Sequence, residues 1–172
     1  PIVLYTYLNP IYRYGFQAFL ADAEKAGVDG LLILDLPPDE ASSNADFNAE
    51  TPLKRIRLIA PTTPDSRIAT LTADASGFLY YVSREGVTGE RTDVAETLPE
   101  RVAAIRKTTS LPIAGGFGIS SPEQVRKVAE VADAVVVGSA IVKRIAEWGQ
   151  DPDLAAKLQN FVEPLARATK SN

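Results

Sequence analysis

Short apolar runs alternate with segments of helical periodicity along the whole chain. The runs are apolar at many successive positions, which is typical of parallel strands whose sheet is covered on both faces. The pattern predicts six strands, at residues 1–7, 29–35, 55–61, 77–83, 111–116 and 133–139.

The segments between these runs carry apolar residues at helical spacing and predict helices. They cover residues 15–27, 65–75, 98–109, 121–132 and 151–168. Ser121 before Pro122 is a good helix start, and Gly27 is placed to end the first helix. Residues 39–54 stand where another helix is expected, although they are rich in Ser, Asn and Asp, which favour caps and turns.

Repetition of strand and helix predicts an α/β fold, either a doubly wound sheet or a (β/α)8 barrel. A closed barrel has eight parallel strands and about 250 residues. This chain of 172 residues shows six strand–helix units, and residues 1–172 are expected to form one domain because no linker stands out. The pattern therefore favours an open sheet or a barrel with two units fewer.

The amino-acid composition limits which side chains could catalyse a reaction or bind a metal. Cys and His are both absent, which excludes disulfides, Cys or His metal ligands, a thiol nucleophile and an imidazole base. Acid–base chemistry would fall to Asp, Glu, Lys or Tyr. The net charge of −4 and the scattered Lys and Arg residues argue against nucleic-acid binding. Because no apolar run approaches membrane-spanning length and no signal-peptide pattern begins the chain, we expect no membrane partner and a cytoplasmic location.

Three glycine-containing segments follow the late strands. They are "REGVTGE" at 84–90, "GGFGIS" at 115–120 and "GSAIV" at 138–142, and the last opens directly into a predicted helix. Glycine lets backbone N–H groups approach an anion, and a helix N-terminus adds a favourable field. Any one segment alone is better explained as a turn. "GGFGIS" also lacks the G-x-G-x-x-G spacing of dinucleotide-binding loops. Three at successive strand ends predict a phosphate site, because barrels commonly bind phosphate there.

Five stretches carry a resemblance to one family. The segment from Thr6 to Ala41, "APTTP", "YYVSREGVTGER", "GGFGISSPEQV" and "VVVGSAIVKRI" together resemble the alpha subunit of tryptophan synthase. The resemblance implies a TIM (β/α)8 barrel, of which this chain would hold the third to eighth strands. The fold expected from it is thus an incomplete barrel of about six βα units, part of a longer protein, with two open sheet edges.

The resemblance also implies an activity and a partner. Members of the family are lyases that cleave indole-3-glycerol phosphate to indole and glyceraldehyde 3-phosphate. The reaction is a retro-aldol cleavage that needs no cofactor. Indole then passes to a beta subunit that carries pyridoxal phosphate (PLP), in an alpha2beta2 complex. Residues 8–12, "LNPIY", match a surface used against that subunit; the simpler interpretation is an Asn-Pro turn.

Site residues follow from the same resemblance, position by position. The positions that match the family's phosphate site are Gly89, Gly116, Phe117, Gly118, Gly138 and Ser139. The positions that match its indole pocket and lid are Tyr5, Tyr7, Asp35, Tyr80, Val82, Thr88 and Val136. Val82 and Val136 are equally explained as barrel core, and Asp35 as a cap for loop N–H groups.

No catalytic residue is expected in this chain. The family's acid–base Glu and Asp lie on its second strand and the following loop, upstream of the matching residues. We therefore predict that the chain holds phosphate but turns nothing over. One alternative is another phosphate-handling barrel, such as indole-glycerol-phosphate synthase or a phosphoribosyl isomerase, which needs a Lys/Glu pair or two aspartates at strand ends. The other is a non-catalytic partner that activates a beta subunit.

Overall fold

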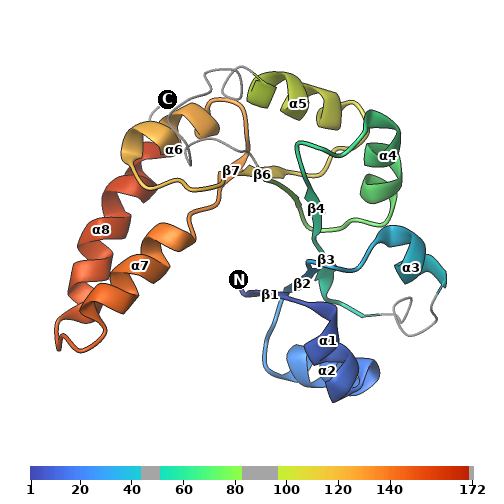
Figure 1. Cartoon of the computed structure of the whole chain (residues 1–172), viewed down its shortest axis with the longest axis horizontal. Helices are drawn as coiled ribbons and strands as arrows, with labels where there is room; N and C mark the ends of the chain where they lie inside the picture. The colour runs from blue at the N-terminus through green and yellow to red at the C-terminus, as the bar shows by residue number, and fades with distance from the viewer. Residues whose placement is uncertain (44–50, 83–96, 171–172) are drawn as a thin grey trace. The chain divides into compact units, whose positions relative to one another are not determined.

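The computed structural model describes residues 1–43, 51–82 and 97–170 (Figure 1). The chain divides into two compact units. The first comprises Pro1–Tyr80 with Thr108–Leu111, and the second comprises Tyr81–Lys107 with Pro112–Asn172. Each unit combines short parallel strands with helices, so the predicted α/β class is confirmed in both.

The sheet of the first unit consists of parallel strands in the order β1, β2, β3. They are β1 (Val3–Thr6), β2 (Gly30–Ile33) and β3 (Lys54–Arg55), and β4 (Arg57–Ile59) follows after one residue. The third predicted strand is therefore divided in two. Ile56 lies between the halves, and its N–H still donates to the carbonyl of Leu31 on β2 at 3.0 Å.

The helices of the first unit are α1 (Leu8–Tyr14), α2 (Phe16–Lys25), α3 (Pro38–Ser43) and α4 (Asp65–Ala73). The predicted end of α2 is confirmed. Gly27 has a φ of +82°, a conformation in which glycine is favoured. The N–H of Val28 donates to the carbonyl of Ala23 at 3.0 Å, which closes the helix with a Schellman motif.

Two predictions for the first unit need correction. Residues 8–12 form the start of helix α1 and not an Asn-Pro turn, because Pro10 lies in the first helical turn, where a missing N–H costs nothing. The helix expected at 39–54 is described only as α3, and 44–50 lie outside the described residues. At its far end the expectation is wrong: Leu53 N–H donates to the Thr51 hydroxyl at 3.2 Å, and the chain then enters β3.

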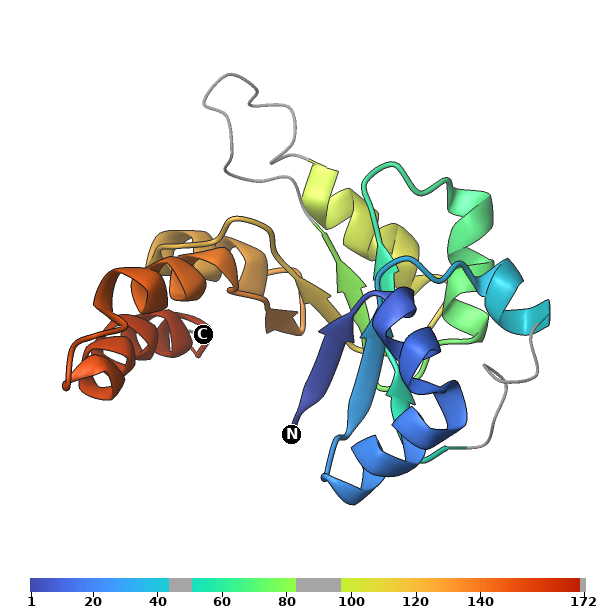
Figure 2. The ribbon, with the colours of Figure 1, turned by 60° about the horizontal axis from the view of Figure 1, so that its bottom comes forward.

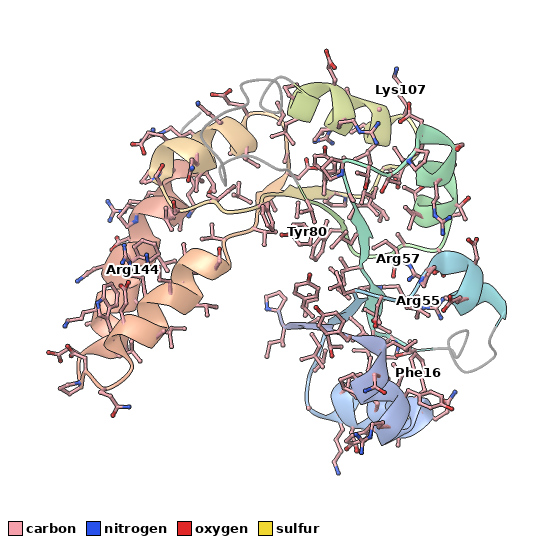
Figure 3. All side chains as sticks on the ribbon, viewed as in Figure 1. Phe16, Arg55, Arg57, Tyr80, Lys107 and Arg144 are labelled. Atoms are coloured by element: carbon pink, nitrogen blue, oxygen red, sulfur yellow. The ribbon has the colours of Figure 1, made fainter. Side chains whose placement is uncertain are left out.

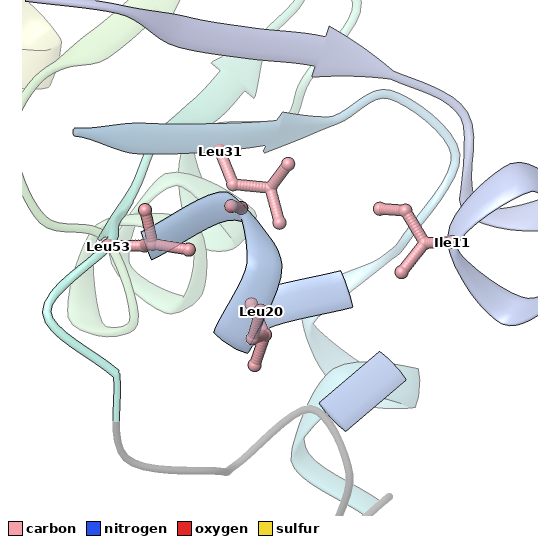
Figure 4. Close-up of a cluster of buried hydrophobic side chains, with 5 residues drawn as sticks. Ile11, Leu20, Leu31 and Leu53 are labelled. Atoms are coloured by element: carbon pink, nitrogen blue, oxygen red, sulfur yellow. The ribbon is translucent and has the colours of Figure 1, made fainter. Parts of the chain in front are cut away.

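The core of the first unit forms where α1 and α2 pack against β2 (Figure 4). Five residues make up this cluster: Ile11, Leu20, Ala23, Leu31 and Leu53. Ile11 is fully buried, and Leu20 and Ala23 lie three residues apart on one face of α2. The helical spacing seen in the sequence is thus the spacing of the residues that reach the core.

In the second unit, β6 (Ile113–Gly115) pairs in parallel with β7 (Ala134–Val135), and β5 (Leu79–Tyr81) crosses the division between the units. Its helices are α5 (Thr97–Arg106), α6 (Pro122–Ala129), α7 (Ser139–Trp148) and α8 (Leu154–Ala168). These helices confirm the four predicted there, and α6, α7 and α8 lie together in Figure 2. None of the helices described in either unit has the length and apolar character needed to span a membrane.

The start of α6 follows the predicted capping chemistry. The Ser121 hydroxyl accepts from the backbone N–H of Gln124 at 3.4 Å, and the Gln124 side chain accepts from the N–H of Ser121 at 3.1 Å. The two residues form a reciprocal capping box. This fixes the direction in which the chain leaves the glycine-containing loop and enters α6.

A buried arginine holds β4 to its surroundings. The Arg57 side chain is 10% exposed; its guanidinium donates to the Leu36 carbonyl at 3.2 Å and pairs with the Asp74 carboxylate. Arg55 pairs with the same carboxylate at 3.0 Å. Burial alone would raise the pKa of Asp74, but the hydrogen bonds and charges of Arg57 and then Arg55 outweigh it, and the pKa is lowered. Asp74 therefore stays ionised between two cations.

We expect Asp74→Asn to lower the free energy of unfolding at pH 7 by about 2 kcal/mol, because a buried guanidinium loses its counter-charge. Since the folded pKa of Asp74 lies below its unfolded value, the pairing stabilises the protein above that unfolded value, about 3.9. The contribution is lost as the pH falls through the folded pKa. Urea unfolding followed by circular dichroism measures the free energy of unfolding at pH 7 and pH 3. Between these two pH values, Asp74→Asn should lose less of this free energy than the unmodified chain.

Asp39→Asn is the matched control, because it removes a carboxylate from an exposed pair with Arg67, whose side chains are 68% and 48% exposed. Such pairs contribute about 0–1 kcal/mol. Equal effects of the two substitutions at pH 7 would contradict a structural role for Asp74.

Candidate functional site

The loop after β6 is shaped by two glycines in conformations that other residues rarely adopt. Gly116 has a φ of +143° and Gly118 a φ of +69°. A Cβ on Gly116 would lie 2.6 Å from the carbonyl oxygen of Val136, just after β7. The N–H of Gly116 donates to the Tyr81 carbonyl at 3.3 Å. Gly116 is therefore needed for close approach of two strand ends, and its amide is engaged by β5.

The loop after β7 leads directly into α7. The carbonyl of Gly138 accepts from the N–H groups of Ile141 at 2.9 Å and Val142 at 3.1 Å. The N–H groups of Ser139 and Ala140, at the first two helical positions, come too early in α7 to find a carbonyl within the helix. A Cβ on Gly138 would meet no atom of the described neighbours within 4 Å. Packing within the described protein therefore does not explain this glycine.

The two loops face one cavity of about 400 Å³ within the second unit. It is lined by Gly118, Ser120, Ser139, Ala140, Lys143, Arg144 and Phe161. Two of the predicted phosphate-site residues, Gly118 and Ser139, thus share a cavity, while Gly116 and Gly138 flank them in the chain. Phe117 is 45% exposed between the two glycines of its loop. Gly89 and Thr88 lie outside the described residues.

Two cations of α7 line this cavity. The Arg144 guanidinium donates to the Glu147 carboxylate at 2.8 Å. It also lies over the ring of Trp148, 5.6 Å from the centroid, and over Phe161 of α8 at 5.3 Å. Figure 3 shows Arg144 between α7 and α8. Cation–π contacts on two rings hold this side chain in place.

Lys143 and Arg144 were not among the predicted site residues. The basic residues of the chain form no run and were therefore interpreted as scattered. The signal that could have found them is helical spacing: Lys143 stands four residues after Ser139, and residues four apart share a helix face. A basic residue one turn beyond a phosphate-type helix start is visible in the sequence once that spacing is applied.

Three tyrosines from the predicted indole pocket lie near one another in the first unit. Burial and then Tyr7 raise the pKa of Tyr5, and burial and then Tyr5 raise the pKa of Tyr80. Figure 3 marks the position of Tyr80. Because the ordinary tyrosine pKa is about 10, a raised value keeps the phenols of Tyr5 and Tyr80 neutral. These two side chains suit an aromatic wall and not a general base.

Asp35 lies at the carboxyl end of β2, beside the end of β1. Its carboxylate accepts from the backbone N–H of Leu8 at 2.6 Å. Leu8 is the first residue of α1, and the preceding Tyr7 gives the helix no side-chain cap. Asp35 therefore caps α1 from the next strand, as the capping interpretation predicted. A substrate contact for Asp35 stays a prediction.

Val82 and Val136 belong to the second unit and are both half-buried. Val82 follows β5 directly, and Val136 follows β7, where its N–H donates to the carbonyl of Gly115 at 2.8 Å. Both are thus at strand ends, as expected from their positions in the sequence. Their role in an indole pocket stays a prediction.

A cavity of about 40 Å³ in the first unit is lined mainly by apolar side chains, together with Arg55 and Arg57. None of the predicted site residues lines it. Within residues 1–43, 51–82 and 97–170, there is no group of three or more His, Cys, Asp or Glu residues that could hold a metal ion.

Comparison with known proteins decides between the barrels considered above. The family model described as tryptophan synthase alpha chain matches residues 1–170. The chain belongs to the tryptophan synthase alpha chain family. Its α/β fold is similar to the TIM barrels of tryptophan synthase alpha subunits, which favours the barrel over the doubly wound sheet.

Relatives of known sequence carry the same name. The chain is 50% identical over 171 residues to the tryptophan synthase alpha chain of Opitutus terrae, which covers 99% of this chain and 64% of the relative. It is 46% identical to that of Phenylobacterium zucineum over 171 residues, which are 99% of this chain and 62% of the relative. The chain therefore spans a little less than two thirds of the length of these tryptophan synthase alpha chains.

A solved structure of the tryptophan synthase a2b2 complex from Pyrococcus furiosus is also similar. A chain of it matches 97% of this chain with a TM-score of 0.84 and 40% sequence identity, and 67% of that chain is covered. The identity is high enough that the tryptophan synthase alpha family and its fold are supported together.

We expect Gly116→Ala to lower the free energy of unfolding by about 2–4 kcal/mol, because it combines an unfavourable φ with overlap of the Val136 carbonyl. Gly138→Ala should cost at most about 1 kcal/mol, since its Cβ enters open space. Urea denaturation of both variants and the unmodified chain measures the difference. If the Gly138 variant were the less stable of the two, this account of the loops would be wrong.

Proposed function

We propose that this protein serves the lyase reaction of tryptophan biosynthesis, in which indole-3-glycerol phosphate is cleaved to indole and glyceraldehyde 3-phosphate. The observation that carries the proposal is the family match over residues 1–170. The gathering of the loops at Gly118 and Ser139 around one cavity supports it. The substrate's phosphate would bind at those loops.

The phosphate site is proposed to act through backbone N–H groups. Ser139 and Ala140 carry the first N–H groups of α7, and the positive end of the helix dipole favours a dianion there. The Ser139 hydroxyl, exposed at the cavity, is a further donor. Gly118 and Phe117 provide backbone N–H groups from the other loop. Glycine at 138 leaves space for the phosphate oxygens to approach the backbone.

The carbon–carbon cleavage needs a proton delivered to the indole ring carbon and another removed from a substrate hydroxyl. The described residues near β1 and β2 offer poor groups for this. The phenols of Tyr5 and Tyr80 have raised pKa values, and the Asp35 carboxylate is engaged by the N–H of Leu8. We therefore propose that the 172-residue chain binds the substrate without cleaving it, and that neither this binding nor the reaction needs a cofactor.

A second candidate function is that of a non-catalytic partner of a beta subunit. The use of Asp35 as a helix cap favours it for this chain. The Pyrococcus furiosus relative was solved as an a2b2 complex, and we propose the same type of assembly here, with PLP held by the beta subunit alone. Residues 8–12, at the start of helix α1, are the proposed contact surface, and the exposed Tyr12 and the nearby exposed Tyr14 suit an interface.

Titration calorimetry with inorganic phosphate tests the site directly. We expect the full chain to bind phosphate and Gly138→Ala to bind it about tenfold more weakly, because the added methyl group occupies the approach to the backbone. Chloride at the same ionic strength is the control ligand and should not compete. Equal phosphate affinity in the unmodified chain and the variant would remove Gly138 from the site.

An assay with indole-3-glycerol phosphate tests the reaction. The purified chain should bind this substrate but release no indole above background in the steady state, and it should be retained by an immobilised tryptophan synthase beta subunit. Release of indole by the chain alone would refute the inactivity and establish the lyase. Failure to bind both the substrate and the beta subunit would overturn the proposed function.

A further inference from the structure

The cavity between the glycine loops is positively charged. Two cationic side chains, Lys143 and Arg144, line it, and none of the residues described around it is a carboxylate. The remaining lining consists of backbone, hydroxyl groups and one aromatic ring. A cavity with cations and N–H donors but no anion attracts a negatively charged ligand.

The two cations differ in how far they are already paired. Arg144 is held by Glu147 at 2.8 Å and by two aromatic rings, and its side chain is 37% exposed. Lys143 reaches the other oxygen of the same carboxylate only at 4.0 Å, and its side chain is 73% exposed. One carboxylate thus faces two cations. Arg144 takes the closer contact, so Lys143 carries the charge that remains available.

The ammonium group of Lys143 lies 4.0 Å from Glu147, one turn toward the C-terminus of α7, but helix geometry also leaves the first turn of α7 within its reach. Each Cα–Cβ bond of an α-helix tilts toward the N-terminus, so a long side chain covers the preceding turn. Lys143 lies four residues after Ser139 on the same face of α7. Its flexible stem can carry the ammonium group back toward the first turn, where the N–H groups of Ser139 and Ala140 have no carbonyl partner within α7.

We propose that Lys143 is a phosphate-positioning residue that supplies the side-chain charge of this site. The ligand it fits is a phosphate monoester dianion, bound by backbone N–H groups at the start of α7 and by the ammonium group from the turn above. Arg144 holds α7 against α8 and is not the ligand contact. This inference rests on the proposed function, and it adds a salt-dependent contact to a site otherwise built from backbone donors.

The experiment measures the dissociation constant of inorganic phosphate for the full chain by titration calorimetry, at about 20 mM and about 300 mM ionic strength, where the Debye length falls severalfold. The variants are Lys143→Gln, which keeps a polar side chain and removes the charge, and Lys143→Arg, which keeps the charge. Lys127→Gln is the matched control, because Lys127 is an exposed lysine of α6 that does not line the cavity.

We expect Lys143→Gln to weaken phosphate binding about tenfold at low ionic strength and about twofold at high ionic strength, as a charge contact is screened. Lys143→Arg should stay within about twofold of the unmodified chain, and so should Lys127→Gln. Circular dichroism should show unchanged helix content in all variants, since loss of the distant pair with Glu147 costs only a few tenths of a kcal/mol.

Three results would overturn the inference. If Lys143→Gln bound phosphate as tightly as the unmodified chain at low ionic strength, Lys143 would be a solvated surface residue and the proposed function would stand. If Lys127→Gln weakened binding equally, the effect would be that of net charge and not of position. If the unmodified chain bound no phosphate, the proposed phosphate site itself would be wrong together with this inference.

Discussion

The close approach of Gly116 to the end of β7 is the constraint on which the candidate site depends. No side chain fits between this glycine and the carbonyl of Val136, and the N–H of Gly116 is used by Tyr81. The two strands therefore end side by side, and the loops that follow must share one region of the second unit. That is why Gly118 and Ser139, far apart in the chain, line one cavity.

Glycines of one loop system thus have different physical roles. Gly116 and Gly118 are needed because their backbone has a positive φ, whereas a Cβ would be tolerated at Gly138. A sequence cannot separate these cases, because each appears only as a glycine after an apolar run. The structure separates them through φ and through the atoms that a side chain would meet. Gly138, the glycine proposed to meet the phosphate, is the one that packing does not explain.

Much of the fold was predictable because its signals are local. The ends of α2 at Gly27 and of α6 at Ser121 follow from cap chemistry within a few residues. Helix α1 was missed because an Asn-Pro pair suggests a turn, while its actual cap, Asp35, is 27 residues away in the sequence. The helix predicted at 39–54 was wrong at its far end, because Thr51 and the strand that follows it occupy that stretch.

In the candidate site, too, features set by neighbouring residues were predicted and features set by distant residues were not. The two loops proposed to bind phosphate were singled out by their glycine residues and by a helix start, which are sequence features. The difference between Lys143 and Arg144 was not predicted, because it depends on contacts in space: Arg144 is the closer of the two to Glu147, and Phe161 reaches it from α8. The placement of Tyr5 and Tyr80 in an indole pocket stays a prediction. The rise of their pKa values comes first from burial, which a single sequence does not report.

The aromatic clamp on Arg144 has a thermodynamic consequence. Phe161 is both a wall of the cavity and a contact of Arg144, so the cavity is complete only while the last helix is docked. A ligand that binds the docked arrangement alone adds its binding free energy to the stability of that docking. Ligand binding at the two loops and docking of α8 therefore stabilise each other.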